Sequence, residues 1–506
     1  MINAIELTEI TDRDLRSARY EASMSPLFTP ASIVVVGAST SGTGAGAGFL
    51  RSLRNFGYSG RIYAVHPSAG EVLGLKAFRT LAELPEVVDY AYVATSADQA
   101  VQLIEGSQGR VRFAQVMASG FGEDSGEDTQ AGANRAAMLL EAATRSGVRI
   151  VGPNCMGTHS PRGGLSFVDG ASRRVGHVGV VCQSGGLGID IIRSGEQRGL
   201  EFSGVVTVGN CVDVSIAEVL EFYTQDEDTA IIGIYVESVR EGGRFFEAIS
   251  AAARRKPVVL LKGGRTAAGS RAASSHTGAM MTDDRLWTGL CRQTGTVLVE
   301  SLDEMLDALV AFQSLSCRSD GVTSTTVLMG NGGGASVLAT DDFTRCGFDL
   351  PRLSGSTISS LKDLELPPGT GLLNPVDTPA GTLSQREGAI ATEILHHIGG
   401  EPGIDAVVMH ANVTVLLTNT DDPHTVLTNL ARAAIVFQRT KREELHLLLV
   451  LRSDGSQPVE EAVRAIAEPA RSAGIPVFPQ LLNAARGLRS VRTREASLTR
   501  GSEESS

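Results

Sequence analysis

Long apolar runs, paired cysteines and aromatic side chains are all scarce in this sequence. No stretch approaches the roughly 18 apolar residues of a membrane-spanning helix, and the first residues lack the basic start of a signal peptide. The six cysteines show no CxxC spacing, which argues against a zinc site and against a disulfide framework. We therefore expect a chain with reduced thiols that stays in the cytoplasm.

Positive charge is in deficit as well. The chain has 45 lysines and arginines against 57 aspartates and glutamates, a net charge of -12. A nucleic-acid backbone or an anionic membrane surface repels such a chain unless a local basic patch attracts it. The tightest basic cluster, Arg254-Arg255-Lys256, precedes a predicted strand and has the position of a solvated helix end. We expect neither nucleic acid nor membrane as the main partner.

Glycine, in contrast, is abundant, at 57 residues. Short runs rich in valine and isoleucine are repeatedly followed by a glycine-rich turn and then by a helical pattern. This order predicts an α/β fold with doubly wound parallel sheets. The predicted strands are 33–36, 62–65, 89–93, 113–117 and 149–151, then 178–181, 204–208, 231–236 and 257–262, then 327–329, 406–409, 446–451 and 476–478.

The strands fall into three series, which suits a chain of 506 residues at about 150 residues a domain. A short polar stretch at 314–324 separates the second series from the third. The predicted division is a loose segment at 1–25, domains at 26–157, 158–316 and 325–491, and a disordered tail at 492–506.

The first glycine-rich turn follows the strand at 33–36 and precedes a predicted helix. Backbone amides at such a helix start suit a phosphate or pyrophosphate, although the turn also has a simple packing interpretation. No acidic residue ends the second strand, which reads RIYAVHP from Arg61, so a dinucleotide ribose has no evident partner. NAD is therefore disfavoured.

The motif GPNCMG from Gly152 closes the first series with two glycines and a proline. It is either a rigid turn between domains or a segment that contacts substrate directly. Cys155 within it has no evident base beside it, so a packed thiol is the better interpretation than a nucleophile.

The second series opens on QSGGLG from Gln183, in which a hydroxyl and adjacent glycine amides form an anion cradle at a helix start. The carboxyl ends of parallel strands share one crevice, so this turn, Glu237 after the strand at 231–236, and the loop after Lys262 that holds His276 can converge. His276 stands among small residues and is a competent nitrogen nucleophile. The alternatives are a capping or buried histidine, and a salt bridge from Glu237 to Arg240 or Arg244.

Seven motifs follow one another between Phe28 and Val491: SIVVVGAST at 32, GPNCMG at 152, QSGGLG at 183, VGNCVDVS at 208, YVES at 235, SSHTGA at 274 and GNGGGASVLATD at 330. In this order they resemble the NDP-forming acyl-CoA synthetases, the family of the ADP-forming acetate-CoA ligases and succinyl-CoA synthetases. The resemblance implies a Rossmann-like CoA-binding domain followed by two flavodoxin-like domains.

The resemblance also implies residue roles. His276 is then the phosphohistidine, Glu237 its stabilising carboxylate, and Ser184, Gly185 and Gly186 the phosphate-binding helix start. The CoA site includes Gly37, Ala38, Ser39, Thr40 and Pro67.

By the same resemblance, phosphate attacks the thioester of an acyl-CoA, the acyl phosphate phosphorylates His276, and the phosphohistidine passes its group to ADP. The chain would be an α-type subunit that binds CoA and a small carboxylic acid or acyl-CoA. A separate ATP-grasp β-type subunit would bind Mg²⁺ with ADP or ATP, giving a hetero-oligomer, because no ATP-grasp pattern follows the third series.

Three positions depart from the family pattern. His66 stands where asparagine is usual before the proline, Gly186 where alanine is common, and Cys211 where a lysine often occurs. Two other classes compete with the ligase: a non-catalytic CoA- or acyl-CoA-binding regulatory protein, and an NAD-dependent oxidoreductase, for which the ribose-binding acid is missing.

Overall fold

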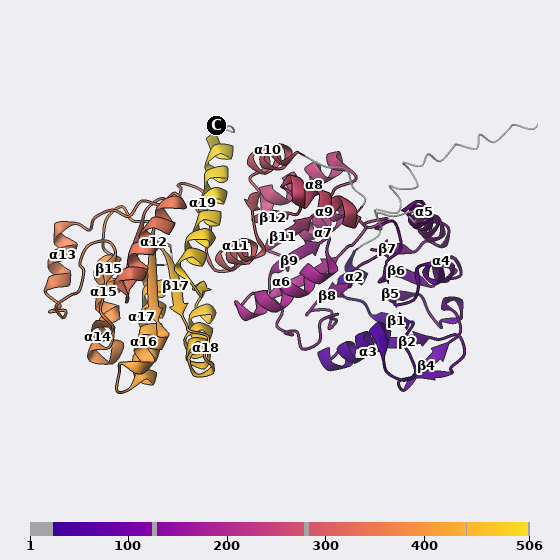
Figure 1. Cartoon of the computed structure of the whole chain (residues 1–506), viewed down its shortest axis with the longest axis horizontal. Helices are drawn as coiled ribbons and strands as arrows, with labels where there is room; N and C mark the ends of the chain where they lie inside the picture. Colours follow the sequence, from indigo (N-terminus) through magenta and orange to yellow (C-terminus); the bar gives the residue numbers. More distant parts are fainter. Residues whose placement is uncertain (1–23, 124–128, 278–282, 442, 504–506) are drawn as a thin grey trace, which may run out of the picture.

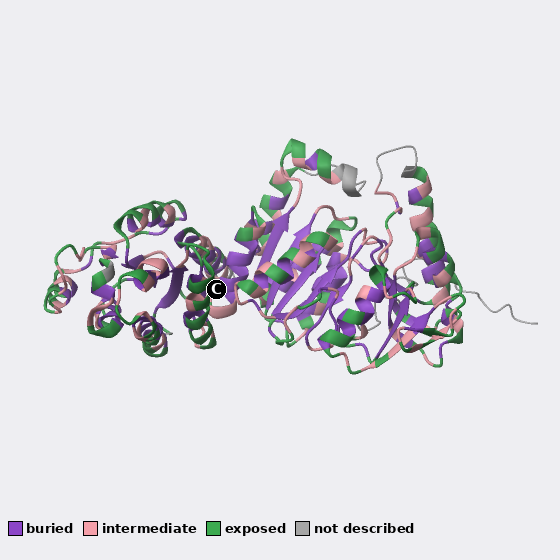
Figure 2. Ribbon diagram, turned by 60° about the horizontal axis from the view of Figure 1, so that its bottom comes forward, coloured by how far each residue is buried: buried purple, intermediate pink, exposed green. Residues whose placement is uncertain are grey.

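The computed structural model describes residues 24–123, 129–277, 283–441 and 443–503. Its strands form three sheets, of seven, six and five strands. The sheets follow one another along the long axis of the molecule, and helices cover both faces of each (Figure 1). The strands are buried, whereas the helices expose their outer sides (Figure 2). The predicted α/β class with parallel sheets is confirmed.

The first sheet has the order β3-β4-β2-β1-β5-β6-β7, and only β3 runs antiparallel to its neighbour. Alternate residues of β1 face opposite sides, so Ile33 and Val35 pack with α3 while Val34 and Val36 pack with α4 and α5. The elements are α2 (Ser25–Phe28), β1 (Ser32–Val36), α3 (Gly44–Phe56), β2 (Arg61–Val65), β3 (Glu71–Val72), β4 (Leu75–Phe78), η1 (Leu81–Glu83), β5 (Val88–Val93), α4 (Ala97–Glu105), β6 (Val111–Val116), α5 (Thr129–Ser146) and β7 (Arg149–Val151).

The second sheet has the order β13-β12-β11-β9-β10-β8, with β8 antiparallel. Helices α6 and α11 pack on one face, and α7 and α8 pack on the other, in a core that continues into the first sheet. The elements are β8 (Thr158–His159), β9 (Val178–Cys182), α6 (Gly185–Gln197), β10 (Phe202–Thr207), α7 (Ile216–Gln225), β11 (Ile231–Val236), α8 (Gly242–Arg255), β12 (Val258–Lys262), α9 (Ala267–Thr277), α10 (Asp284–Thr294), β13 (Val297–Val299) and α11 (Leu302–Ser314).

The third sheet has the order β15-β14-β16-β17-β18 and is parallel throughout. Helices α12 and α19 share a core with α11 of the second unit, while α15, α17 and α18 pack on the other face. The elements are β14 (Thr326–Gly330), α12 (Gly333–Arg345), α13 (Gly355–Lys362), β15 (Val376–Asp377), α14 (Ala380–Leu383), η2 (Gln385–Gly388), α15 (Ile390–Ile398), β16 (Ala406–Asn412), α16 (Val413–Thr418), α17 (Pro423–Lys441), β17 (His446–Arg452), α18 (Gln457–Ser472), β18 (Val477–Phe478) and α19 (Leu481–Glu503).

The prediction of a disordered tail at 492–506 is wrong for the part that the structure describes. Helix α19 continues through Glu503, and Leu488 and Val491 are buried in the core that it shares with α11. Farther along, the carboxylate of Glu495 is buried and accepts hydrogen bonds from the backbone N–H groups of Arg318 and Thr323. A buried acid with specific partners is indistinguishable from a solvated one in the sequence.

The search of the described residues for a membrane-spanning segment found no helix with enough length and apolar character.

Candidate active site

The start of helix α6 lies directly after the buried strand β9. Ser184 is the residue before the helix, and its Oγ accepts a hydrogen bond of 3.3 Å from the backbone N–H of Leu187. The first amides of a helix have no carbonyl partner within it, and the helix dipole makes this end positive. Gly185 and Gly186 are the first two helical residues and border a cavity. The sequence motif thus folds into a strand-turn-helix unit with exposed glycine backbone at the helix start.

Gln183 connects this turn to the neighbouring one. Its side-chain Oε1 accepts hydrogen bonds from the backbone N–H groups of Glu237 and Ser238, at 2.7 and 3.0 Å. Strands β9 and β11 are parallel neighbours, with Cys182 opposite Tyr235, so the two turns leave the sheet at the same edge. The carboxylate of Glu237 in turn accepts a hydrogen bond from the Tyr235 hydroxyl at 3.0 Å. The structure therefore brings together the turn at 184–186 and Glu237.

The third predicted contributor follows strand β12, which ends at Lys262 opposite Val236 of β11. The expected loop after it is wrong: helix α9 covers Ala267–Thr277, because this alanine-containing stretch favours helix. His276 is the penultimate residue of this helix, and its side chain lies outside the described residues. Its approach to Glu237 stays a prediction.

Lys262 is a charged group that the sequence analysis did not assign. Its side chain is 7% exposed, its ammonium donates a hydrogen bond to the carbonyl of Gly263, and it lies 5.4 Å from the centre of the Trp287 ring. Burial lowers the pKa of this ammonium, an effect that Glu237 and Asp284 oppose. The lysine therefore places a cation close enough to Glu237 for the carboxylate to act on it.

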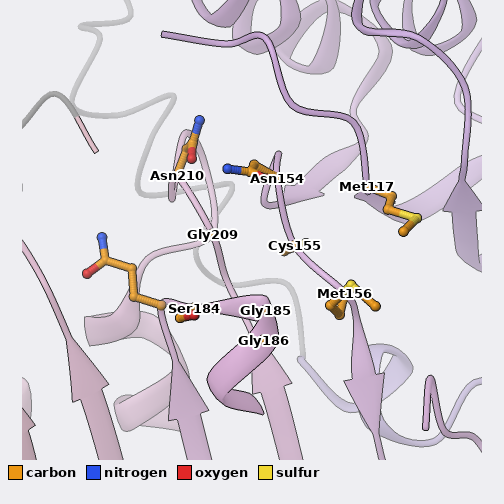
Figure 3. Close-up of a pocket in the computed structure, with 10 residues that line it drawn as sticks. Met117, Asn154, Cys155, Met156, Ser184, Gly185, Gly186, Gly209 and Asn210 are labelled. Carbon is orange, nitrogen blue, oxygen red and sulfur yellow. The ribbon is translucent and has the colours of Figure 1, made fainter. Parts of the chain in front are cut away.

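A cavity of about 250 Å³ lies between the first and second units at this edge (Figure 3). One wall is the turn at 183–186. The opposite wall comes from Met117, after β6, and from the GPNCMG motif, through Asn154, Cys155 and Met156. Gly209 and Asn210 of the VGNC motif complete the lining.

The GPNCMG motif serves both as a turn between units and as a cavity wall. The backbone N–H groups of Met156 and Gly157 donate to the Thr207 hydroxyl at 3.0 and 2.8 Å, which ties the motif to strand β10. Cys155 is buried, and burial raises the pKa of its thiol to about 12, so the thiol is neutral at pH 7. The interpretation of Cys155 as a packed thiol agrees with this environment.

A second cavity, of about 530 Å³, lies at the carboxyl ends of β1 and β2. Gly37, Ala38, Ser39 and Pro67 line it, whereas Thr40 is not among the described residues that do. Gly37 has φ +86°, and a Cβ there would come within 2.3 Å of the Ala94 carbonyl oxygen, so only glycine fits.

The same cavity contains a cation that the sequence analysis missed. Arg79, directly after β4, lines it, and β4 pairs in parallel with β2, so the arginine lies at the same sheet edge as His66 and Pro67. His66 also lines the cavity, and its ring Nδ1 accepts a hydrogen bond of 3.0 Å from the backbone N–H of Ala69. A phosphorylated ligand in this cavity would find its counter-charge in Arg79.

The two other departures from the family pattern are compatible with the local geometry. A Cβ on Gly186 would meet no heavy atom within 4 Å, so glycine is not required there. Cys211 has φ +51°, and its thiol donates to the carbonyl of Gly209 within the turn that borders the first cavity.

The described residues contain no group of three or more histidine, cysteine or acidic side chains that is placed to hold a metal ion.

Comparison with known proteins places these features in a family. Residues 31–161 match a CoA binding domain, and residues 175–312 match a succinyl-CoA ligase like flavodoxin domain. The chain is 31% identical over 481 residues to the acetate-CoA ligase [ADP-forming] I subunit alpha of Pyrococcus furiosus, covering 92% of this chain and 96% of that one. It is 31% identical over 382 residues to the II subunit alpha of the same organism, covering 75% and 80%.

Among solved structures, the dinucleotide forming acetyl-coenzyme A synthetase 1 of Ca. Korarchaeum cryptofilum, in complex with phosphate and ADP, superposes with a TM-score of 0.78 at 26% identity. The match covers 95% of this chain and 99% of that one. The fold, both domain matches and the alignment with the Pyrococcus subunits agree, and the chain belongs to the family of the ADP-forming acetate-CoA ligase alpha subunits.

Proposed function

We propose that this chain is the α-type subunit of an acid-thiol ligase that interconverts acyl-CoA, phosphate and ADP with a carboxylic acid, CoA and ATP. The observation that carries the proposal is the cavity at the start of α6, where glycine backbone of the second unit faces residues of the CoA-binding unit. Phosphate suits a helix start of this kind, because amide donors and the positive end of the helix dipole act on it together.

The reaction has three balanced steps. A phosphate oxygen attacks the thioester carbonyl, the C–S bond breaks, and CoA leaves as a thiolate that takes up a proton. A ring nitrogen of His276 then attacks phosphorus in the acyl phosphate, the P–O bond to the acyl group breaks, and the carboxylate leaves. Finally, a β-phosphate oxygen of ADP attacks the phosphohistidine, the N–P bond breaks, and ATP and free imidazole result.

The residues of this chain act by holding these groups. Ser184, Gly185 and Gly186 bind the phosphate in the first two steps, and Glu237 accepts the remaining ring N–H of His276, which stabilises the cation formed on phosphorylation. Gln183 supports Glu237 because its side-chain oxygen accepts hydrogen bonds from the backbone N–H groups of Glu237 and Ser238 and so holds the backbone of this turn in place.

The partner and the ligands follow the same proposal. The relatives are named as alpha subunits, which implies a second subunit, and we assign to it the ATP-grasp domain with ADP and Mg²⁺. We assign CoA to the cavity lined by Gly37, Ala38, Ser39 and Pro67, with Thr40 next in the same turn, and we assign one of its phosphates to Arg79, which also lines the cavity.

The test uses the full chain reconstituted with an ATP-grasp subunit from a related ligase. Labelled ATP and Mg²⁺ should give an acid-labile, base-stable phosphoprotein that is lost in His276→Asn. His424→Asn, which changes an exposed histidine of the third unit, is the matched control and should keep the label. Label that persists in His276→Asn contradicts the carrier assignment. Acyl-CoA binding without any turnover would favour the regulatory alternative.

A further inference from the structure

Lys262 is a buried cation that the three steps of the reaction do not use. Its side chain is 7% exposed, and its ammonium donates a hydrogen bond to a neutral group, the carbonyl of Gly263. The face of the Trp287 ring lies 5.4 Å away and adds a weak attraction for the cation. A buried ammonium of this kind is costly unless an opposite charge lies nearby.

The pairing of strands β11 and β12 places Lys262 next to the turn of Glu237. Val236 lies opposite Lys262, and the backbone N–H of Gly263 donates to the Val236 carbonyl at 2.9 Å. A Cβ on Gly263 would come within 2.6 Å of the Tyr235 hydroxyl oxygen and within 3.3 Å of the Glu237 Cγ. The residue whose carbonyl binds the ammonium therefore packs directly against the side chains of Tyr235 and Glu237.

Two carboxylates act on the charge of Lys262, and one of them is already paired. Glu237 and Asp284 favour the charged ammonium, while Arg265 opposes it. Both oxygens of Asp284 accept hydrogen bonds from the Arg265 guanidinium, so these two side chains form a pair with no net charge. Glu237 is therefore the carboxylate that offsets the charge of Lys262.

The attraction between the two charges also acts on Glu237, whose side chain is half-buried. Burial favours the neutral form of a carboxylic acid, and a cation nearby favours the charged form. In the charged form the carboxylate accepts a ring N–H of a histidine and offsets the positive charge of the ring. A cation that holds an acid in this form therefore supports the histidine without touching it.

The other titratable groups near this pair do not compete for the role. Burial raises the pKa of the Tyr235 hydroxyl and of the Cys182 thiol well above their usual ranges, so both are neutral at pH 7. Among the described residues, the titratable and charged groups around Lys262 and Glu237 are Tyr235 of β11, Cys182 of β9, Asp284 of α10 and Arg265 after β12.

We propose that Lys262 is a positioning residue for phosphoryl transfer, which acts through Glu237 and keeps its side chain in the carboxylate form that the phosphohistidine step needs. The inference rests on the proposed function, because it takes His276 as the carrier and Glu237 as the acceptor of its ring N–H. Loss of the cation should slow the reaction only where Glu237 is able to take up a proton.

The test follows phosphorylation of His276 by labelled phosphate and acetyl-CoA in the reconstituted complex at several pH values. Each rate is divided by the wild-type rate at the same pH, which removes pH effects that all chains share. Lys262→Met should be about threefold to fivefold slower near about pH 6 and nearly normal near about pH 8, as expected when loss of a cation lets a carboxylate take up its proton about two pH units higher. Lys262→Arg keeps the charge and should show little of this loss.

Two further comparisons separate this role from a structural one. In the Glu237→Gln background, where the side chain has no charge to lose, Lys262→Met should cause no further pH-dependent loss. Lys256→Met is the matched control, because Lys256 precedes the other end of β12 and its ammonium also donates to backbone carbonyls, those of Tyr223 and Asp226, at 2.5 and 2.7 Å. It should lower the stability of the chain without a pH-dependent loss of rate.

Trp287 reports on the packing beside Lys262, because it is the single tryptophan of the chain and is buried. Its emission, measured on the full chain before reconstitution, should stay that of a buried indole in Lys262→Met. Emission typical of an exposed indole would assign Lys262 a packing role and overturn the inference.

The kinetic outcomes separate the two levels of the proposal. A loss in Lys262→Met that is equal at every pH, or one that depends on pH but persists in the Glu237→Gln background, would overturn the inference and leave the ligase function intact. Absence of His276 phosphorylation in the wild-type complex would overturn the proposed function and the inference that rests on it.

Discussion

Helices α6 and α12 begin in the same way, but the two helix starts differ in charge. Each helix follows a buried parallel strand through a glycine-rich turn, QSGG before α6 and GNGGG before α12. The start of α6 borders a cavity whose described lining has no charged side chain. At α12 a carboxylate is present: Oδ2 of Asp377 lies 2.9 Å from the position of a Cβ on Gly333.

The carboxylate at α12 comes from the end of the neighbouring strand β15, where Asp377 lies opposite Gly330. A carboxylate is favourable at the positive end of a helix dipole, and there it excludes a second anion. Ser336 within the helix donates to the Asp377 Oδ1 at 3.4 Å, so helix and acid are joined. The positive end of the α12 dipole is therefore already paired with a carboxylate of the protein, that of Asp377.

Two basic groups, Arg452 and His410, also lie near the start of α12. Arg452 donates to the Asn331 carbonyl at 2.6 Å and so holds the turn. His410 is buried beneath the helix start, and burial, with Arg452 nearby, lowers its pKa to about 3, so its ring is neutral at pH 7. A glycine-rich turn therefore supplies amides, and a carboxylate that reaches the first glycines of the helix, as Asp377 does at α12, takes the place of an external anion.

The largest effect is expected when the start of α6 is given a carboxylate of its own. In Ser184→Asp the helix stays capped, because aspartate is as good as serine at this position. Phosphorylation of His276 should fall by roughly 1000-fold, since a like charge about 4 Å from the phosphate costs about 4 kcal/mol at an effective dielectric constant of 20. The rate at which labelled phosphate and acetyl-CoA phosphorylate His276 in the reconstituted complex measures this effect, because this label transfer comprises the two steps assigned to the start of α6.

Two matched variants control for the cap and for the other helix. Ser184→Asn keeps a neutral cap and should retain most of the rate. Asp377→Asn removes the acid at α12 and should leave label transfer unchanged. Normal transfer in Ser184→Asp would show that phosphate binds elsewhere, and a slowed reaction in Asp377→Asn would show that α12 takes part.

A smaller effect is expected where side-chain amides hold the turns. Gln183→Leu leaves the half-buried N–H groups of Glu237 and Ser238 without their acceptor, at a cost of at most about 1 to 3 kcal/mol for each group. We expect a lower midpoint of urea unfolding and slower phosphorylation, because Glu237 loses its support.

The third unit offers the matched control for this change. The Oδ1 of Asn331 accepts a hydrogen bond of 2.7 Å from the backbone N–H of Asn412, which is the same link between neighbouring turns. Asn331→Leu should lower the unfolding midpoint in a similar way without changing the phosphorylation rate. Equal losses of rate in both variants would mean that Gln183 acts only through stability.

The long strands were predictable because each is a buried run of branched residues next to a glycine-rich turn. A run of two or three residues gives only a weak pattern: β7 and β18 were predicted, whereas β8, β13 and β15 were missed. Helix α19 was missed because its buried charges, among them Glu495, find partners far away in the chain. Contacts between residues that are far apart in the chain decide whether these elements form, and a single sequence does not reveal such contacts.

The turns of the candidate site were predictable for a physical reason: the carboxyl ends of parallel strands meet at one edge. The uncharged residues that complete the site were not. Gln183 and Met156 carry no chemical signal in the sequence, and Arg79 lies outside every motif. The charge at α12 was also hidden, because Asp377 belongs to one of the strands that were missed.

The smallest effect is expected at the two glycines that open α6. A Cβ on Gly186 would meet no heavy atom within 4 Å, whereas one on Gly185 would meet Met156 at 2.8 Å. Gly186→Ala should therefore keep the phosphorylation rate and gain at most about 1 kcal/mol of stability from helix propensity. Gly185→Ala should displace Met156 and slow the phosphorylation moderately, because the added methyl group disturbs the packing at the helix start. Gly334→Ala, equally open in α12, is the control for helix propensity alone. A rate lost in Gly186→Ala but not in Gly334→Ala would show that the anion approaches α6 so closely that even a methyl group blocks it.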